Sequence, residues 1–162
     1  MTTKDLLRQL VEFGHQVTQM YVADLNDADL LLRIVPGANH IAWQLGHQVA
    51  STSHLLKALG HPGMALPDGF EAAYTAETSK SDKPSDFAPK AKYLALMEQA
   101  KAASLAAIDA TPDSALDNPA PEPLREYMPT VGFVLSVLGT HWLMHAGQFI
   151  PIRRKLGKQA MF

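Results

Sequence analysis

Residues 140–145, Thr-His-Trp-Leu-Met-His, decide the fold of this chain, because they place two histidines inside a long apolar run from 131 to 152. Residues four apart on an α-helix share one face, with Cβ atoms roughly 5–6 Å apart. The run follows the alternating three- and four-residue spacing of a helix face that packs into a core, at Val131, Val134, Leu138, His141, His145, Gln148 and Ile152. This stretch is therefore predicted to be a core helix, with both imidazoles directed inward.

The composition is that of an ordinary folded domain. The chain has 162 residues, of which 47% are hydrophobic and 19% charged. A chain of this length fits one domain spanning residues 1–162 and can bury a substantial core. Its 14 Lys and Arg residues against 16 Asp and Glu residues give a net charge of −2. With no general attraction to polyanions, nucleic acid is not an expected partner.

Histidine carries the distinctive chemistry, since the chain has seven histidines and no cysteine. Disulfides, thiolate metal ligands and a cysteine nucleophile are thereby excluded, and a transition metal would have to bind imidazole nitrogen. The first residues do not show the apolar core of a signal peptide, and the run 131–152 is interrupted by histidine, glycine and proline. We expect a cytoplasmic protein with no membrane span.

Helical periodicity recurs in three further long segments and one short one. The pattern predicts long helices over 3–26, from a cap at Asn39 to Gly60, over 87–110, and from a cap at Thr130 to Leu156, with a short helical piece over 27–35. Thr2 or Thr3 is available to cap the first helix, and Ser85 or Asp86 to cap the third long one.

Two long connections separate these helices. Residues 61–86 and 111–129 are rich in proline and polar residues, and connections of this length in a small domain are often functional. We expect 61–86 to act as a lid. No segment alternates apolar and polar residues as a strand does. The predicted fold class is therefore all-α, a four-helix bundle with long connections.

A third histidine could join the pair on the last helix. His47 lies in the middle of the helix predicted to begin after Asn39, and facing helices of a bundle can direct such side chains into one interior site. A catalytic zinc ion commonly takes three protein ligands and keeps one position open. The alternative is that these are core histidines bound to neighbouring groups. His40 and His54, two turns to either side, are too far along the helix to join them and are interpreted as rim residues.

Better-known metal motifs do not fit. The HExxH zinc motif requires glutamate at position 142, which is tryptophan. A ferritin-like di-iron site needs two Glu-x-x-His motifs, and only Glu12 to His15 has that spacing. The sequence contains no nucleophile elbow, phosphate-binding loop or dinucleotide fingerprint.

Three segments resemble the DinB/YfiT-like (damage-inducible protein B-like) superfamily of metal-dependent enzymes. They are residues 39–47, Asn-His-Ile-Ala-Trp-Gln-Leu-Gly-His, residues 141–148, His-Trp-Leu-Met-His-Ala-Gly-Gln, and residues 153–157, Arg-Arg-Lys-Leu-Gly. Their order and helix placement match along nearly the whole chain. The resemblance implies a four-helix bundle, often dimeric, in which His47, His141 and His145 bind a divalent metal ion.

The resemblance also frames the expected activity. We expect an enzyme in which a three-histidine site activates water or a small thiol, as a hydrolase or a thiol transferase acting on a small-molecule substrate. Zinc, nickel or iron would suit nitrogen ligands, and a low-molecular-weight thiol is a possible second cofactor. The alternative is a non-catalytic, dimeric helical bundle that binds a metal or ligand. In either case we expect a homodimer.

No catalytic residue is assigned, but four side chains are candidates for orienting a metal ligand or a substrate. Gln148 lies on the histidine face of the last helix, and Trp43 and Trp142 flank the predicted ligands. The two tryptophans are better explained as packing around the site. Tyr21 is a candidate for acid or base assistance, as are Glu98 and Glu126, although structural or solvated roles fit each of them better.

Overall fold

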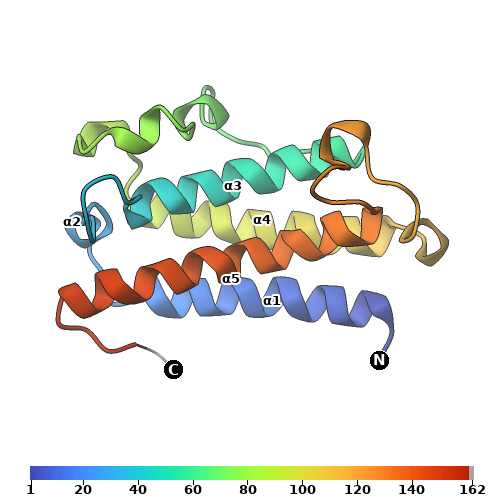
Figure 1. Ribbon diagram of the computed structural model, residues 1–162, viewed down its shortest axis with the longest axis horizontal. Helices are drawn as coiled ribbons and strands as arrows, with labels where there is room; N and C mark the ends of the chain where they lie inside the picture. The colour runs from blue at the N-terminus through green and yellow to red at the C-terminus, as the bar shows by residue number, and fades with distance from the viewer. Residues whose placement is uncertain (161–162) are drawn as a thin grey trace.

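The computed structural model describes residues 1–160, and in that range the regular structure is helical. One short helix, α2, covers Asp27–Leu30. The long helices are α1 Thr3–Val22, α3 Ile41–Ala58, α4 Lys90–Ala110 and α5 Val131–Lys155. They lie side by side as a bundle in Figure 1. Residues 1–160 form no strand, and one isolated β-bridge joins Pro119 to Thr130. The predicted all-α bundle is confirmed.

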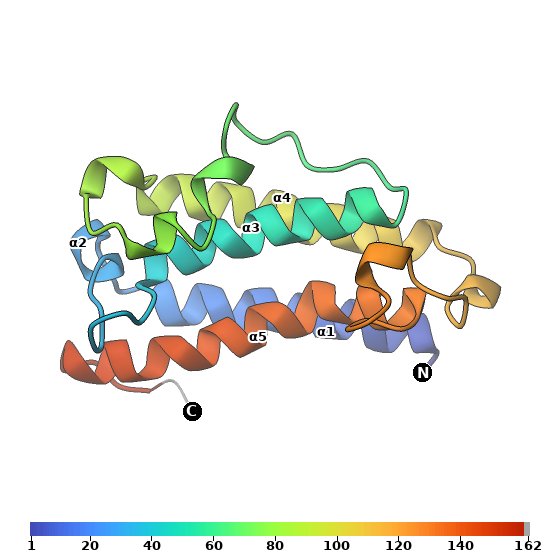
Figure 2. The ribbon, with the colours of Figure 1, turned by 45° about the horizontal axis from the view of Figure 1, so that its top comes forward.

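The order of the helices around the bundle explains the first long connection. α5 packs against α1 and α3, and α4 packs against α3 and α1. Figures 1 and 2 show that α1 and α5 run in one direction while α3 and α4 run in the other. Because α3 and α4 are parallel, the chain must return along the whole bundle between them. It does so through three short 3₁₀ turns, Glu71–Ala73, Thr78–Lys80 and Pro84–Asp86.

The ends of two helices are capped as their sequences predict. The Thr2 hydroxyl accepts a hydrogen bond from the Asp5 amide, and the Asp5 carboxylate accepts one from the Thr2 amide. Thr130 accepts from the amide of Phe133 at the start of α5. These contacts satisfy amides that have no partner within the helix.

Other predicted boundaries were wrong for local reasons. α1 ends at Val22 because Asn26 is extended and caps α2 with its own side chain. His40, not Asn39, caps α3, its Nδ1 accepting from the Trp43 amide. α4 begins at Lys90 rather than at 87, since Pro89 precedes it in an extended conformation and the residue before a proline disfavours the helical region.

Two glycines allow α1 and α5 to touch through their backbones. A Cβ atom at Gly139 would overlap the backbone of Leu10, and one at Gly14 would overlap the carbonyl oxygen of Gly139. Only glycine, which has no Cβ atom, lets the two helices approach so closely at these positions. This crossing fixes the position of α5, and therefore of its two histidines, relative to α1.

The core is divided into two apolar clusters toward the two ends of the bundle. Along α5, Leu138 belongs to one cluster and Trp142 to the other, so His141 lies at their boundary. Within residues 1–160, no helix combines the length with the apolar character that crossing a lipid bilayer requires.

Candidate metal centre

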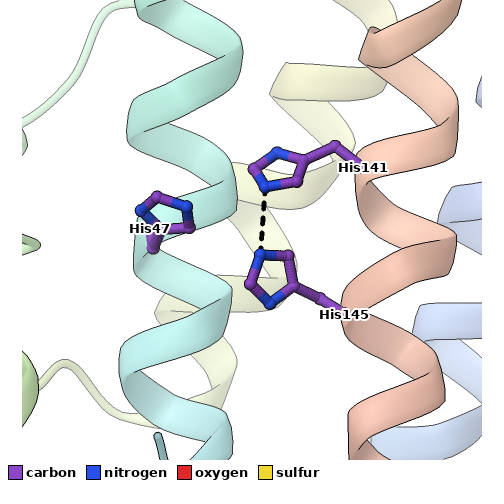
Figure 3. A group of neighbouring side chains, drawn as sticks. All are labelled: His47, His141 and His145. Carbon is purple, nitrogen blue, oxygen red and sulfur yellow. Dashed lines mark hydrogen bonds between the residues drawn. The ribbon is translucent and has the colours of Figure 1, made fainter.

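The bundle brings His47, His141 and His145 together between α3 and α5 (Figure 3). Each offers one ring nitrogen, and these nitrogens lie within 4.8 Å of one another. The ring centroids of His47 are 5.3 Å from those of His141 and His145. His145 is buried, while the other two are partly exposed. The group therefore has one buried histidine, His145, and is accessible to solvent at His47 and His141.

His145 is held by an amide on the facing helix. The Gln44 Nε2 atom donates to the Asn39 carbonyl, which leaves Oε1 directed at His145. Nδ1 of His145 lies 2.8 Å from that oxygen. An amide oxygen only accepts, so Nδ1 carries the proton and Nε2 has the free lone pair. This is the tautomer that a metal ligand requires, and it is commonly set by such an outer contact.

The free nitrogen of His145 points at His141. The two Nε2 atoms are 3.0 Å apart, and Figure 3 shows the rings facing each other across this contact. Because Nε2 of His145 has a lone pair, Nε2 of His141 is the donor when no cation lies between them. A cation placed at this point would instead receive a lone pair from each ring.

His47 is positioned by neighbours on the α3 side. The Trp43 ring stacks on it, with centroids 4.8 Å apart and planes within 9°. Trp43 is itself tied to the connection above α3, since its Nε1 atom donates to the Thr75 carbonyl and to the Thr78 hydroxyl. The connection thereby holds the ring that orients His47.

Burial keeps all three imidazoles neutral at neutral pH. It lowers the pKa of His141 to about 4, with a smaller contribution from His47. It lowers the pKa of His145 to about 3, and the other two rings add to the effect. Burial also lowers the pKa of His47, while a hydrogen bond to the Tyr74 backbone acts in the opposite direction. Neutral imidazole is the form that binds metal ions.

A pocket of about 540 Å³ opens beside the site. His47 and His141 form part of its wall, so the three-histidine group is reached from it. The remaining lining comes from α3 and α5 and from both long connections: Ala50, Ser51, His54, Leu55, Glu71, Tyr74, Leu124, Met128 and Val137. Both connections thus help to form the wall of one pocket.

The predicted rim residues have different positions. His54 is exposed and lines the pocket. His40 was wrongly interpreted as a rim residue, because it is fully buried as the cap of α3, with its ring edge-on to Phe87.

The other candidate side chains lie at several places in the bundle. Trp43 contacts His47, as described above. Trp142 is buried against His15, with ring centroids 4.3 Å apart. Gln148 is exposed and lines a separate, smaller pocket. Tyr21 is buried, and its carbonyl accepts a hydrogen bond from Arg153 near the end of α5.

Comparison with known proteins agrees with this architecture. The family model described as the DinB superfamily matches residues 10–149. The chain belongs to the DinB superfamily. A conserved protein from Enterococcus faecalis has a similar crystal structure, with a TM-score of 0.76 over 98% of this chain and 99% of that one. At 18% identity this likeness concerns the fold alone. A search of curated proteins found no significant match.

The donor set of this DinB protein suits a divalent transition ion. Three neutral imidazoles match the nitrogen preference of zinc, nickel and iron, and three protein ligands leave coordination positions for other molecules. The second nitrogen of His145 is engaged by Gln44, as is usual for a metal-ligating histidine. These features together fit a metal ion better than they fit a purely structural histidine cluster.

Two residues important to the DinB site were not identified from the sequence. Gln44 precedes His47 by three residues, so it lies one helical turn away on a similar face. That spacing was the available signal. Tyr74 covers α3 because Gly46 leaves room for its ring, where a Cβ atom would overlap the tyrosine. Nothing near Tyr74 in the sequence indicates this contact.

Proposed function

We propose that the protein is a divalent-metal-dependent enzyme in which His47, His141 and His145 hold one ion. The observation that carries this proposal is that three neutral imidazoles converge at the wall of a pocket. A divalent ion held there would lower the pKa of a bound water or small thiol and polarise an electrophile. Hydrolysis and thiol transfer are the two reaction classes that this chemistry serves.

The surrounding residues have supporting roles in this proposal. Gln44 would keep the Nε2 lone pair of His145 available to a bound ion. Stacking on Trp43 limits rotation of the His47 ring. The largely apolar pocket wall would lower the local dielectric around the reacting groups, which strengthens electrostatic interactions there.

The second candidate function is a bundle that binds a metal or ligand without turnover. A purely structural metal site is usually closed by four protein ligands. In residues 1–160 the candidate group consists of three residues, two of which face the pocket. A site with three protein ligands and access to a pocket favours the enzyme over the non-catalytic bundle.

Metal titration of stripped protein by calorimetry tests the site. Zinc, nickel and iron(II) are titrated into the wild type and into His47→Ala, His141→Ala and His145→Ala, with His54→Ala as the control. We expect each ligand variant to lose most of its affinity and His54→Ala to retain it. Equal affinity in the wild type and His145→Ala would overturn the ligand assignment.

An activity screen then separates the two candidate functions. The metal-loaded protein is assayed with ester and amide substrates and with several low-molecular-weight thiols plus electrophiles. Turnover that disappears in the three ligand variants supports the enzyme. Tight metal binding without turnover supports the non-catalytic bundle.

We also propose a homodimer formed through α1 and α5. The family resemblance implies dimerisation, and several exposed large apolar side chains lie on these two helices: Leu6, Phe13, Phe133 and Met144. Because α1 and α5 pack side by side, apolar side chains exposed on both helices suit a contact with a second copy.

A further inference from the structure

We infer that the pocket accepts an elongated, largely apolar, uncharged molecule with one end group at His47 and His141 and a neutral hydrogen-bonding group at His54. The position of the end group at His47 and His141 depends on the proposed metal site. The rest of the inference concerns the shape and charge of the pocket itself, and it names the class of substrate that the proposed enzyme would take.

The wall of the pocket is largely apolar. Its wall includes five apolar side chains, Ala50 and Leu55 of α3, Val137 of α5, and Leu124 and Met128 of the second long connection, while Ser51 of α3 adds one hydroxyl. A volume of about 540 Å³ lies within the range of pockets that hold small organic molecules. Such a wall stabilises the hydrocarbon part of a ligand, at about 0.8 kcal/mol for each buried methylene.

The charges around the pocket disfavour an ionic substrate. In the part of the chain that the structure describes, its lining includes no Lys or Arg. The single lining carboxylate, Glu71, accepts hydrogen bonds from Lys57 at 2.7 Å and from Ser53 at 2.9 Å. Away from the proposed ion, a charged group entering the pocket would lose hydration without gaining an unpaired countercharge from the protein.

The separation of the two histidine ends sets the length of the molecule. His54 follows His47 by seven residues on α3. At 1.5 Å per residue this is roughly 10 Å along the helix. His54 is the polar residue best placed to select the far end of the substrate, since Ser51 lies nearer to His47 along α3 and Glu71 is already engaged.

Alkyl hydroxamic acids of increasing chain length probe this geometry. They are titrated into zinc-loaded protein by calorimetry, from acetohydroxamic to dodecanohydroxamic acid. We expect affinity to rise about fourfold for each methylene, until the chain spans the roughly 10 Å to His54, and then to level off. A terminal hydroxyl on the longest chain that fits should add about fivefold in the wild type and nothing in His54→Ala.

Substitutions of the wall test the same pocket. Ala50→Phe fills it, and Ala106→Phe is the matched control at an exposed position of α4. We expect Ala50→Phe to abolish the dependence on chain length while zinc stoichiometry and the circular dichroism spectrum stay unchanged. Should Ala50→Phe unfold, Val137→Gln reduces the apolar wall instead and should weaken the dependence on chain length. An unaltered dependence in the folded wall variant overturns the inference.

A second probe series distinguishes failure of the pocket from failure of the metal site. Straight-chain alcohols are titrated into metal-stripped protein, where they report on the apolar wall alone. If zinc binds but hydroxamate affinity is independent of chain length, the pocket inference is wrong and the metal proposal stands. If alcohols bind with the expected length dependence but zinc does not bind, the metal proposal is wrong and the apolar pocket stands.

Discussion

The side-chain oxygen of Gln44 lies 2.8 Å from Nδ1 of His145, joining α3 to α5 at the three-histidine group. This contact fixes which nitrogen of His145 has the lone pair, and so it determines how the ring presents itself to a cation. It also connects the smaller pocket near Gln148, which Gln44 helps to line, with the metal centre.

Loss of the Gln44 amide should weaken metal binding without removing a ligand. We expect Gln44→Met to reduce zinc affinity by about 10- to 100-fold, because His145 loses the acceptor that holds its tautomer. Gln48→Met is the matched control, since Gln48 is equally buried one turn further along α3 and donates to the Gln44 carbonyl. Calorimetric titration with zinc measures both, and similar losses in the two variants would contradict the assigned role of Gln44.

Two glycines of α5 should respond in opposite ways to alanine. Gly139→Ala places a methyl group in the backbone of Leu10 and should cost at least about 2 kcal/mol of unfolding free energy. At Gly147 the space is open, so Gly147→Ala should stabilise the helix by about 0.5–1 kcal/mol. Urea denaturation of both variants measures the difference. A stable Gly139→Ala protein would show that α1 and α5 do not cross through their backbones.

The stability of the protein should depend on pH through His15. This residue is 1% exposed, and its ring nitrogens have no hydrogen-bond partner within residues 1–160. Burial lowers the pKa of His15 from 6.5 to about 4, with smaller effects from Lys101 and Glu98. His15 is therefore harder to protonate in the folded state than in the unfolded state. The free energy of unfolding is unaffected by His15 well above pH 6.5 and decreases as the pH drops toward 4.

His15→Phe isolates this contribution from those of the other buried histidines. The phenyl ring keeps the contact with Trp142 and has no proton to bind. The difference in unfolding free energy between variant and wild type should change by about 3 kcal/mol between pH 7 and pH 4. Denaturation with urea in the presence of a chelator measures it at each pH. A difference that does not vary with pH would mean that His15 titrates normally.

The proposed homodimer makes a prediction about charge on α1 and α5. Phe13→Lys and Met144→Lys each place a cation among the exposed apolar side chains of these helices. We expect sedimentation at micromolar concentration to show a dimer for the wild type and a monomer for the double variant, since burying an unpaired charge is costly. Val35→Lys is the control at an exposed apolar position outside both helices. A monomeric wild type would remove the proposal.

Local patterns predicted much of the fold. The apolar periodicity from 131 to 152 correctly indicated α5, and the cap at Thr130 lies where its sequence places it. The start of α4 was missed because Pro89 outweighed the helix propensity of the residues before it. His40 was misplaced because a capping side chain folds back on its own helix and does not project to the rim.

The candidate site was predictable where it depends on helix faces. His141 and His145 share a face of α5 by their spacing, and the family resemblance adds His47 on α3. The contact from Gln44 and the cover from Tyr74 depend on how α3 lies against α5 and on the path of residues 59–89, which no local pattern specifies. That the chain forms one domain over 1–162 stays a prediction.

Two kinds of structure meet at the pocket. The three histidines belong to long helices whose positions the core determines, whereas Glu71, Tyr74, Leu124 and Met128 belong to connections outside the four long helices. Substitution of Leu124 or Met128 would alter which molecule fits while leaving the helices that carry the histidines in place, whereas changes around Tyr74 would also reach His47. A gene duplicate of this protein can therefore diverge toward a new substrate through the part of the pocket wall that the second connection supplies, without moving the metal ligands.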